Sequence, residues 1–385
     1  MPIFKLIAQE GKARSGELTT THGIVQTPFF MPIATVGANK SGLEPRDIRE
    51  LGFELILANT YHLNLRPGAD FIESKGGLAK FMAWNGPILT DSGGFQVLSL
   101  AHMRKITEEG VSFASHLDGS KVFLSPEKVV EIEAKLGIDI AMVLDECTPF
   151  PCDYEYAKQS LLRTTRWAER AKKHWQKIGA DQFQHLFAIV QGSTYQDLRI
   201  ESARQLSELD FPGYAVGGVV ESPHQLNEVL DYTVDCLPAN KPRYLMGVGT
   251  PENILEAVER GIDMFDCVLP TRNARHAKIF SSAGSYNVSR AIYRDDDLPL
   301  DPECNCAICQ TYSRGYLRHL FQAQEILALR LASWHNLAFY SNLMQNIRQS
   351  IRQNTFAEYK KTTLAKMQNG FVQHESGLVS RRKHF

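Results

Sequence analysis

Residues 86–94 read GPILTDSGG, a short apolar run that ends in an aspartate and a pair of glycines. Similar runs recur along the chain, each ending in glycine or a polar residue. The eight are TPFFMPIAT (27–35), FELILANTY (53–61), GPILTDSGG (86–94), IDIAMVLDE (138–146), HLFAIVQGS (185–193), GYAVGGV (213–219), RYLMGVGT (243–250) and DMFDCVLPT (263–271). Near-continuous hydrophobicity, rather than strict alternation, is typical of strands that are buried on both faces of a parallel sheet.

Helical patterns separate several of these runs. Ser125 and Pro126 open SPEKVVEIEAKLG, which Gly137 closes, and Thr250 and Pro251 open TPENILEAVERG in the same way. A hydroxyl residue before a first-turn proline, with glycine after the last turn, is a typical pair of helix boundaries. Eight strand–helix units within about 250 residues predict an α/β protein, a TIM-type (β/α)8 barrel.

The alternative architecture is an open doubly wound sheet, which shows similar local patterns but more often has about five to seven strands. No G-x-G-x-x-G follows a predicted strand. We therefore expect no dinucleotide cofactor.

Cysteines in the C-terminal part have the spacing of a metal site. Cys304, Cys306 and Cys309 form C-x-C-x2-C, and His335 follows on a helical stretch. Three thiolates and one imidazole complete the tetrahedral shell of a closed structural Zn²⁺ site. His319 is the other candidate for the fourth ligand, and His335 is favoured because its helix can return across the cysteine loop. We expect one structural Zn²⁺ per subunit.

The chain changes character at about residue 295, where a polar linker, DDDLPLDPE, precedes the cysteines, and a helical stretch of roughly 311–352 follows them. We expect a catalytic barrel over 1–295. A zinc-binding helical subdomain packed on the barrel should follow over 296–370, with a flexible tail over 371–385.

Polar residues follow the predicted strands, at the end where TIM barrels carry their active sites. The segments at these strand ends are Asp91-Ser92-Gly93-Gly94, Asp145-Glu146-Cys147, Gln191-Gly192, Gly217-Gly218, Met246-Gly247 and Asp266-Cys267. A single aspartate there is as often a helix cap as a catalyst, but three at one mouth predict a site. Two carboxylates suit displacement at an anomeric carbon, one as nucleophile and one moving protons. The third, with the Gln191 amide, suits the hydrogen-bonding edge of a purine.

Basic residues follow the last predicted strand. Arg272 and Arg275 come soon after Asp266, and guanidinium groups there suit a phosphate backbone or a base edge. The net charge of −1 provides no overall attraction to nucleic acid, so RNA binding must depend on a local patch. Further basic residues recur in the C-terminal part, each with a solvated helix face as its alternative explanation: Lys278, Arg290, Arg314, Arg318, Arg348, Arg352, Lys360 and Lys361.

Composition indicates an ordinary globular protein, with 43% hydrophobic and 22% charged residues. No run of about 18 apolar residues appears, so we expect no membrane span. The first residues, MPIFKLIAQEGKARSGEL, lack a charged-then-apolar leader. We expect a cytoplasmic protein, which fits an odd number of cysteines used for metal binding.

Together these motifs resemble the bacterial type of queuine tRNA-ribosyltransferase, also called tRNA-guanine transglycosylase. The resemblance covers about residues 4–355, through TPFFMPIATVG, LANTYHL, LTDSGGFQV, MVLDECTP, VQG, YLMGVG, GIDMFDCVLPTR and the C-x-C-x2-C…H site. It implies a pentosyltransferase that exchanges the guanine at the first anticodon position of GUN tRNAs for a free base, a queuosine precursor. It also implies a homodimer, in which one subunit catalyses and the other helps to seat the tRNA.

The resemblance also implies roles for individual residues. Asp266 would be the nucleophile that forms a ribosyl-enzyme, and Asp91 the proton acceptor and donor. The substrate-binding residues would be Ser92, Gly93, Gly94, Phe95, Asp145, Cys147, Gln191, Gly218 and Met246, with Phe95 and Met246 enclosing the base. Segments 247–253 and 271–275 would contact tRNA, through Gly247, Gly249, Thr271, Arg272, Asn273 and Arg275.

The chain departs from the family pattern in two places. Residues 217–221 read GGVVE, two residues shorter than the common GGLAVGE, and His276-Ala277 stands where Asn-Gly is common. In the family the first loop lines the pocket for the precursor's aminomethyl group. A shorter loop removes wall, and we hypothesise that it admits queuine instead of, or as well as, preQ1.

Two rival functions share some of these features. A retaining glycoside hydrolase would also have a barrel with paired acids, but it would more naturally carry glutamates at the strand ends and a tryptophan array at the mouth. A non-catalytic tRNA-binding zinc subunit would be expected to lack the nucleophile, and Asp266 stands here in an intact MFDCVLPTR.

Overall fold

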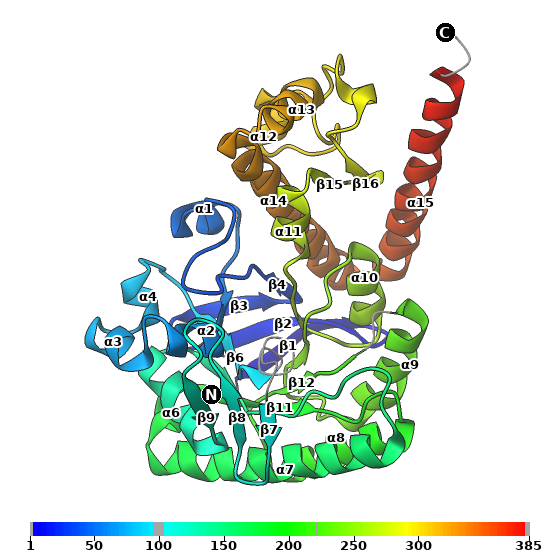
Figure 1. Ribbon diagram of the computed structural model, residues 1–385. Helices are drawn as coiled ribbons and strands as arrows, with labels where there is room; N and C mark the ends of the chain where they lie inside the picture. The colour runs from blue at the N-terminus through cyan, green and yellow to red at the C-terminus, as the bar shows by residue number, and fades with distance from the viewer. Residues whose placement is uncertain (1–2, 95–103, 220–221, 382–385) are drawn as a thin grey trace.

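The computed structural model describes residues 3–94, 104–219 and 222–381. Its centre is a sheet of eight parallel strands, one from each apolar run of the sequence (Figure 1). In chain order they are β4 (Phe29–Met31), β5 (Ile56–Asn59), β6 (Ile88–Asp91), β10 (Ile140–Met142), β11 (His185–Val190), β12 (Tyr214–Val216), β13 (Arg243–Leu245) and β14 (Met264–Asp266).

The sheet closes on itself. The ladder runs β4-β14-β13-β12-β11-β10-β6-β5, and a parallel bridge between Ile33 and Leu57 joins its two ends. There the amide of Leu57 donates to the Pro32 carbonyl at 3.0 Å, and the amide of Ala34 donates to the Leu57 carbonyl at 2.7 Å. The predicted (β/α)8 barrel is confirmed, and the open doubly wound alternative is wrong.

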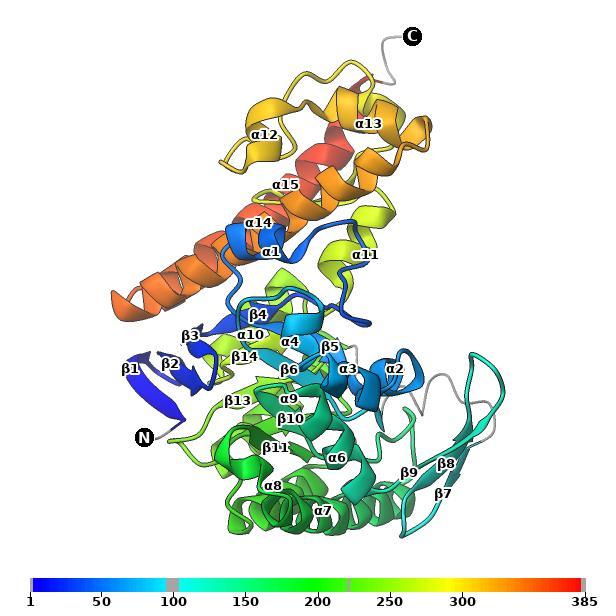
Figure 2. The same ribbon diagram turned by 90° about the vertical axis from the view of Figure 1, so that its left-hand side faces the viewer.

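The segments between and after the barrel strands form helices, several of which cover the outside of the barrel. They are α1 (Pro45–Glu50), α2 (Thr60–Leu65), α3 (Ala69–Ser74), α4 (Leu78–Phe81), α6 (Pro126–Leu136), α7 (Tyr154–Lys177), α8 (Gln196–Glu208), α9 (Pro223–Thr233), α10 (Pro251–Glu259) and α11 (Leu269–Arg275), with short 3₁₀ turns η1 (Ala180–Gln182) and η2 (Val234–Cys236). Figure 2 shows α6, α7 and α8 along one side of the strands. Every residue of β10, β12, β13 and β14 is buried, which explains their uninterrupted hydrophobicity.

The two helix boundaries predicted from caps are confirmed. The Ser125 hydroxyl accepts from the amide of Lys128 at 3.2 Å, and Gly137 closes α6 with a φ of 65°. The Thr250 hydroxyl accepts from the amide of Asn253 at 3.3 Å at the start of α10. In each case the side chain satisfies an amide that the first helical turn leaves without an intrahelical partner.

Two small antiparallel sheets are additions to the barrel. One is formed by β1 (Phe4–Glu10), β2 (Ala13–Thr20) and β3 (Gly23–Thr27), the other by β7 (Arg104–Ile106), β8 (Val111–Ala114) and β9 (Lys121–Leu124). The first sheet lies at the amino ends of the barrel strands, because Arg14 forms a buried ion pair with Asp263 and the amide of His22 donates to Asp139 at 2.9 Å. Asp263 and Asp139 directly precede β14 and β10.

The C-terminal part is built from β15 (Lys278–Ser281), β16 (Gly284–Asn287), the 3₁₀ turn η3 (Ala291–Tyr293), α12 (Ala307–Thr311), α13 (Arg314–Gln322), α14 (Ile326–Arg352) and α15 (Phe356–Arg381). The expected helical stretch of 311–352 is interrupted at Gln324, whose φ is 58°. α14 contacts the barrel, where Arg348 donates to the carbonyl of Pro28 at 2.8 Å. Residues 371–385, expected as a tail, are helical as far as Arg381. None of the described helices is long and apolar enough to cross a membrane.

Candidate active site and metal cluster

Three aspartates stand at the mouth formed by the carboxyl ends of the barrel strands. Asp91 is the last residue of β6, Asp266 is the last residue of β14, and Asp145 follows β10. Burial raises the pKa of Tyr244 well above its ordinary value, and the charges of Asp266 and then Asp91 raise it further. The carboxylates of Asp266 and Asp91 therefore both lie near this one phenol.

Asp145 and Gln191 form a buried polar pair. The Asp145 carboxylate, 8% exposed, accepts from the Ser92 hydroxyl at 3.0 Å and from the Gln191 side-chain amide at 2.7 Å. Burial raises the pKa of Asp145, and the bonds from Gln191 and Ser92 oppose that rise. Among the described residues, Oε1 of Gln191 is buried and accepts no hydrogen bond. Because such an acceptor is costly to bury, the pair suits a ligand that brings an N–H group.

Glycines allow this close packing. A Cβ at Gly94 would lie 2.6 Å from Oδ1 of Asp145, and one at Gly218 would lie 2.4 Å from Oε1 of Gln191. Gly218 also has a φ of 58°, in the left-handed region that favours glycine. The backbone at both positions can therefore approach the polar pair more closely than any other residue would allow.

Asp266 receives two hydrogen bonds on one oxygen. The Tyr244 hydroxyl and the Gly247 amide donate to its Oδ1, at 2.6 and 2.7 Å. Among the described residues, none donates to Oδ2. Burial raises the pKa of Asp266, while the bonds from Tyr244 and Gly247 favour the carboxylate. Asp266 is thus a buried carboxylate with one anchored oxygen and one available oxygen.

Asp91 has a neighbour on each side. The Asn59 side-chain amide, at the end of β5, donates to its Oδ2 at 2.6 Å. On α6, the fully buried Glu133 accepts from the Thr90 hydroxyl at 3.3 Å and from the Met142 amide at 3.2 Å. Burial raises the pKa of Glu133 well above its ordinary value, and the charge of Asp91 adds to that rise. Burial therefore favours the protonated form of Glu133, and the charge of Asp91 favours it further.

A small recess of about 20 Å³ adjoins Asp145 and is also lined by Glu146, Cys147, Arg104 and Trp167. Burial raises the pKa of Cys147 to about 12, so its thiol is protonated at neutral pH and is a poor nucleophile.

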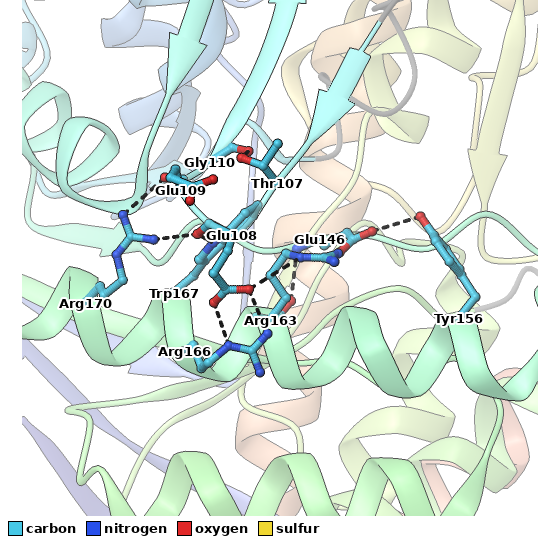
Figure 3. Close-up of polar contacts among 11 residues, drawn as sticks. Thr107, Glu108, Glu109, Gly110, Glu146, Tyr156, Arg163, Arg166, Trp167 and Arg170 are labelled. Atoms are coloured by element: carbon cyan, nitrogen blue, oxygen red, sulfur yellow. Dashed lines mark hydrogen bonds and ion pairs between the residues drawn. The ribbon is translucent and has the colours of Figure 1, made fainter.

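An ion-pair network fixes the residue that follows Asp145. Figure 3 shows Glu146 between Tyr156, which donates to it at 2.8 Å, and Arg163. Glu108, in the turn between β7 and β8, pairs with Arg166 at 2.6 and 2.8 Å. The network attaches both the β10 loop and the β7–β8 turn to helix α7.

The residues expected to contact RNA lie in different environments. Gly247 holds the Asp266 carboxylate, as described above, and a Cβ at Gly249 would lie 2.2 Å from the Cβ of Cys267. Thr271 is buried on α11, Asn273 and Arg275 are half-buried, and Arg272 is exposed. Nη1 of Arg275 is buried and has no hydrogen-bond partner among the described residues.

Several basic residues of the C-terminal part are already engaged within the fold. Arg314 pairs with Asp296 at 3.2 Å, and Lys360 pairs with Glu256 at 2.7 Å. Arg352 donates to the Ser15 hydroxyl at 3.0 Å. These three side chains stabilise packing and do not form an open patch.

Some residues expected at the site are only partly described. Met246 is half-buried, and a Cβ at Gly217 would lie 3.6 Å from its sulfur, which places Met246 beside the Gly217–Gly218 segment. Phe95, expected to enclose the base together with Met246, lies outside the described residues, as do positions 220 and 221 of the shortened loop.

The cysteine cluster has the geometry of a metal site. The ligand atoms of Cys304, Cys306, Cys309 and His335 all lie within 4.8 Å of one another. Nε2 of His335 is 2.8 Å from the carbonyl oxygen of Phe280, and its Nδ1 faces the sulfur of Cys309 at 3.2 Å. A proton on Nε2 leaves the Nδ1 lone pair directed at the thiols, as metal-binding histidines require. The cluster can bind a metal ion, and His335, not His319, is its fourth member.

Comparison with known proteins agrees with this geometry. The family model for queuine tRNA-ribosyltransferase matches residues 9–369. The chain belongs to the queuine tRNA-ribosyltransferase family. A protein of that name from Caldanaerobacter subterraneus subsp. tengcongensis is 55% identical over 357 residues, covering 92% of this chain and 94% of the relative. Another, from Oleidesulfovibrio alaskensis, is 54% identical over 359 residues, or 93% and 94% of the two chains.

Membership of the queuine tRNA-ribosyltransferase family confirms the resemblance seen in the sequence and the expectation of a transferase of the tRNA-guanine transglycosylase kind. It also disfavours a glycoside hydrolase.

Four residues near the site were not assigned a role from the sequence: Asn59, Glu133, Arg199 and Tyr244. Asn59 ends β5 as Asp91 ends β6, so the rule that identified the aspartates would have found it. Glu133 and Arg199 lie on helices, where nothing in the sequence distinguishes an inward-pointing charge from a surface one.

Proposed function

We propose that the chain exchanges the guanine at the first anticodon position of GUN tRNAs for a queuosine precursor, through a covalent ribosyl–Asp266 intermediate. The observation that carries this proposal is the state of Asp266. Its Oδ1 is held by Tyr244 and Gly247, which leaves Oδ2 for attack.

In the first half-reaction Oδ2 of Asp266 attacks C1′ of the guanosine, and the bond from C1′ to the base nitrogen breaks. Asp91 supplies the proton that the leaving guanine takes up. In the second half-reaction the incoming base returns a proton to Asp91, attacks C1′ and releases the Asp266 carboxylate. Protons and charge balance over the cycle, and general acid–base assistance of this kind typically contributes about 10²- to 10⁴-fold.

The base would be recognised at the Asp145–Gln191 pair. The Asp145 carboxylate accepts N–H groups of the purine, the open Oε1 of Gln191 accepts another, and the Gly218 amide donates to the 6-oxo oxygen. Ser92, Gly93 and Gly94 allow the base to approach the backbone, Cys147 adds a neutral thiol beside Asp145, and Phe95 and Met246 enclose the ring.

For tRNA binding we propose α11 and the 247–253 segment. Arg272 is exposed on α11, and on the same helix the buried Nη1 of Arg275 donates to no partner among the described residues. Guanidinium groups in this position suit phosphate and base-edge contacts. Gly247, Gly249 and Thr271 are engaged in packing. We therefore propose that they shape this surface and do not contact the tRNA directly.

For the precursor we propose that queuine is accepted, alone or together with preQ1, because loop 217–221 is two residues shorter than the family pattern. The test is incorporation of labelled guanine, preQ1 and queuine into a GUN-anticodon tRNA. Incorporation of guanine supports the exchange activity, and incorporation of queuine supports the shortened-loop argument. Strong preQ1 incorporation without queuine would reject the queuine assignment, and no incorporation of any base would reject the function.

For the metal we propose one structural Zn²⁺, because three thiolates and an imidazole are the donors and number that a closed zinc site uses. Elemental analysis of the purified protein should find one zinc per chain. A stoichiometric amount of another metal would contradict the assignment.

We also propose a cytoplasmic homodimer, as the resemblance implies. A tRNA substrate places the enzyme where tRNAs are modified, and light scattering on the purified chain should give twice the 43.3 kDa chain mass. A single-chain mass at micromolar concentration would contradict the dimer.

The second candidate function is a non-catalytic tRNA-binding subunit. The anchored Asp266 argues against it, since a binding subunit needs no carboxylate held with one oxygen open. Exchange of labelled guanine by the isolated chain would exclude it.

A further inference from the structure

Arg199 is a buried cation, and none of the carboxylates that the structure describes pairs with it. It lies on α8 and is 0% exposed, and within the described part of the chain it forms no ion pair. Burial lowers its pKa to about 10, so the guanidinium remains charged at neutral pH. Burying an unpaired charge is unfavourable, and an apolar side chain of similar volume would pack at least as well. Packing alone therefore does not account for an arginine here.

Among the described residues, the Arg199 guanidinium donates only to backbone carbonyls. Nε donates to Ser193 at 2.7 Å and Nη1 donates to Val190 at 2.9 Å. Nη1 also donates to Gly217 at 2.7 Å, and Nη2 donates to Gly218 at 2.9 Å. The carbonyls of Val190 and Ser193 lie on either side of Gln191 at the end of β11. Those of Gly217 and Gly218 follow β12. One side chain thus ties together the two loops that carry Gln191 and Gly218.

Peptide geometry connects these bonds to the pocket. In a planar trans peptide, the carbonyl and the next residue's N–H point in opposite directions. Because the Gly217 carbonyl faces Arg199, the Gly218 N–H must point away from it. Among the described residues, this N–H has no acceptor, and the open Oε1 of Gln191 is its neighbour. An unused donor and an unused acceptor therefore stand side by side.

We propose that Arg199 is a positioning residue of the base pocket: it holds the Gly217 and Gly218 carbonyls away from the pocket and so directs the Gly218 amide to the 6-oxo oxygen of the bound purine. Arg199 touches neither base nor ribose. The inference rests on the proposed function, because it assumes that the ligand of this pocket is a guanine-type base.

The test is Arg199→Lys, which keeps the charge but lacks the planar fork needed to reach all four carbonyls. We expect KM for free guanine to rise about 10-fold or more, while KM for tRNA and kcat change less than about 3-fold. 6-Thioguanine keeps the N–H groups but offers a poor acceptor in place of the 6-oxo oxygen. The ratio of the 6-thioguanine inhibition constant to the KM for guanine should therefore fall about 10-fold in the Arg199→Lys variant.

The matched control is Arg243→Lys. Arg243 is another buried arginine that donates to a carbonyl, that of Leu237 at 3.0 Å, but it begins β13 at the opposite end of the barrel. Arg243→Lys should leave both the KM for guanine and the inhibition constant of 6-thioguanine unchanged. If Arg199→Lys does not fold, Arg199→Gln, which buries no charge and keeps two donors, should show the same loss of discrimination.

An unchanged ratio of the 6-thioguanine constant to the guanine constant in folded Arg199 variants would overturn the inference. Equal effects in the Arg199 and Arg243 variants would do the same. Absence of guanine exchange by the unmodified chain would instead reject the proposed function, so the two failures are distinguishable.

Discussion

At the scale of single residues, the site depends on how each carboxyl group is held. Tyr244 and Gly247 both bind one oxygen of Asp266, and the other oxygen receives no hydrogen bond from the described residues. Burial favours the protonated form of Glu133, whereas the proposed mechanism needs Asp266 as a carboxylate. Different environments can thus give chemically identical groups separate tasks.

Tyr244→Phe should slow the enzyme by lowering the fraction of Asp266 that is ionised. The Tyr244 hydroxyl lowers the pKa of Asp266 against the effect of burial, and a hydrogen bond to a charged group contributes about 1.5–3 kcal/mol. In the proposed mechanism Asp266 attacks as the carboxylate, which exists above its pKa. Loss of the hydroxyl should therefore lower kcat about 10- to 100-fold at neutral pH and move the acidic limb of the kcat profile to higher pH. Tyr232→Phe, at a phenol that binds the Thr194 carbonyl, is the control. An unmoved acidic limb would contradict this role.

Glu133→Gln should stabilise the protein, and more so at higher pH. A carboxyl group whose folded-state pKa is raised contributes stability below its unfolded pKa and loses it as pH rises through the folded value. Glutamine cannot ionise but can still accept from the Met142 amide. The unfolding free energy of the variant relative to the original chain should increase between pH 5 and pH 8, by at most about 1.4 kcal/mol per pH unit. Urea unfolding measures this, with the exposed Glu169→Gln as control. A pH-independent difference would refute a neutral Glu133.

Whether a site residue could be predicted from the sequence depended on its position along a strand. Asp91 and Asp266 were predictable because they end apolar runs, and the strands do end there. Tyr244 and Arg199 were not, because their roles arise from which way they point and which loop they meet. Those contacts are made between separate elements of the fold, as where Tyr244 on β13 donates to Asp266 on β14.

At the scale of elements, local chemistry decided what could be predicted. The eight strands were recognisable from buried hydrophobicity, and α6 and α10 from their caps. The β1–β3 and β7–β9 sheets were missed because their strands lack an uninterrupted apolar run. β1, β7 and β9 are partly exposed, whereas β2, which reads ARSGELTT, is mostly buried but polar in sequence. The break at Gln324 was missed because its left-handed backbone is not marked by glycine or proline.

Removal of the metal should destabilise the segment that holds the cysteine cluster but not the barrel. A structural zinc typically contributes on the order of 10 kcal/mol to the folding of its site. After chelation, amide hydrogen exchange should speed up across residues 304–335, while β10 to β14 keep their protection. Cys306→Ser should reproduce this effect and Cys236→Ser, a cysteine outside the cluster, should not. Equal loss of protection in the barrel strands would show that the metal supports the whole fold.

At the scale of the whole molecule, barrel closure makes the site. The loops after β6, β10, β11, β12 and β14 are separated by up to about half of the chain, yet parallel strands bring them to one mouth. The N-terminal sheet covers the other end, and α14 joins the metal cluster to the barrel, where Tyr340 donates to the Gly249 carbonyl beside the site. The parallel barrel could be predicted from the sequence, but these packing relations could not.

The most direct measurement is the trapping of a covalent tRNA–protein adduct on a denaturing gel, with the attached peptide identified by mass spectrometry. The unmodified chain should give an adduct on the peptide that contains Asp266. Asp266→Asn should give none, and Asp231→Asn, at an exposed aspartate, should give the normal amount. An undiminished adduct in Asp266→Asn, or attachment at another residue, would contradict the account.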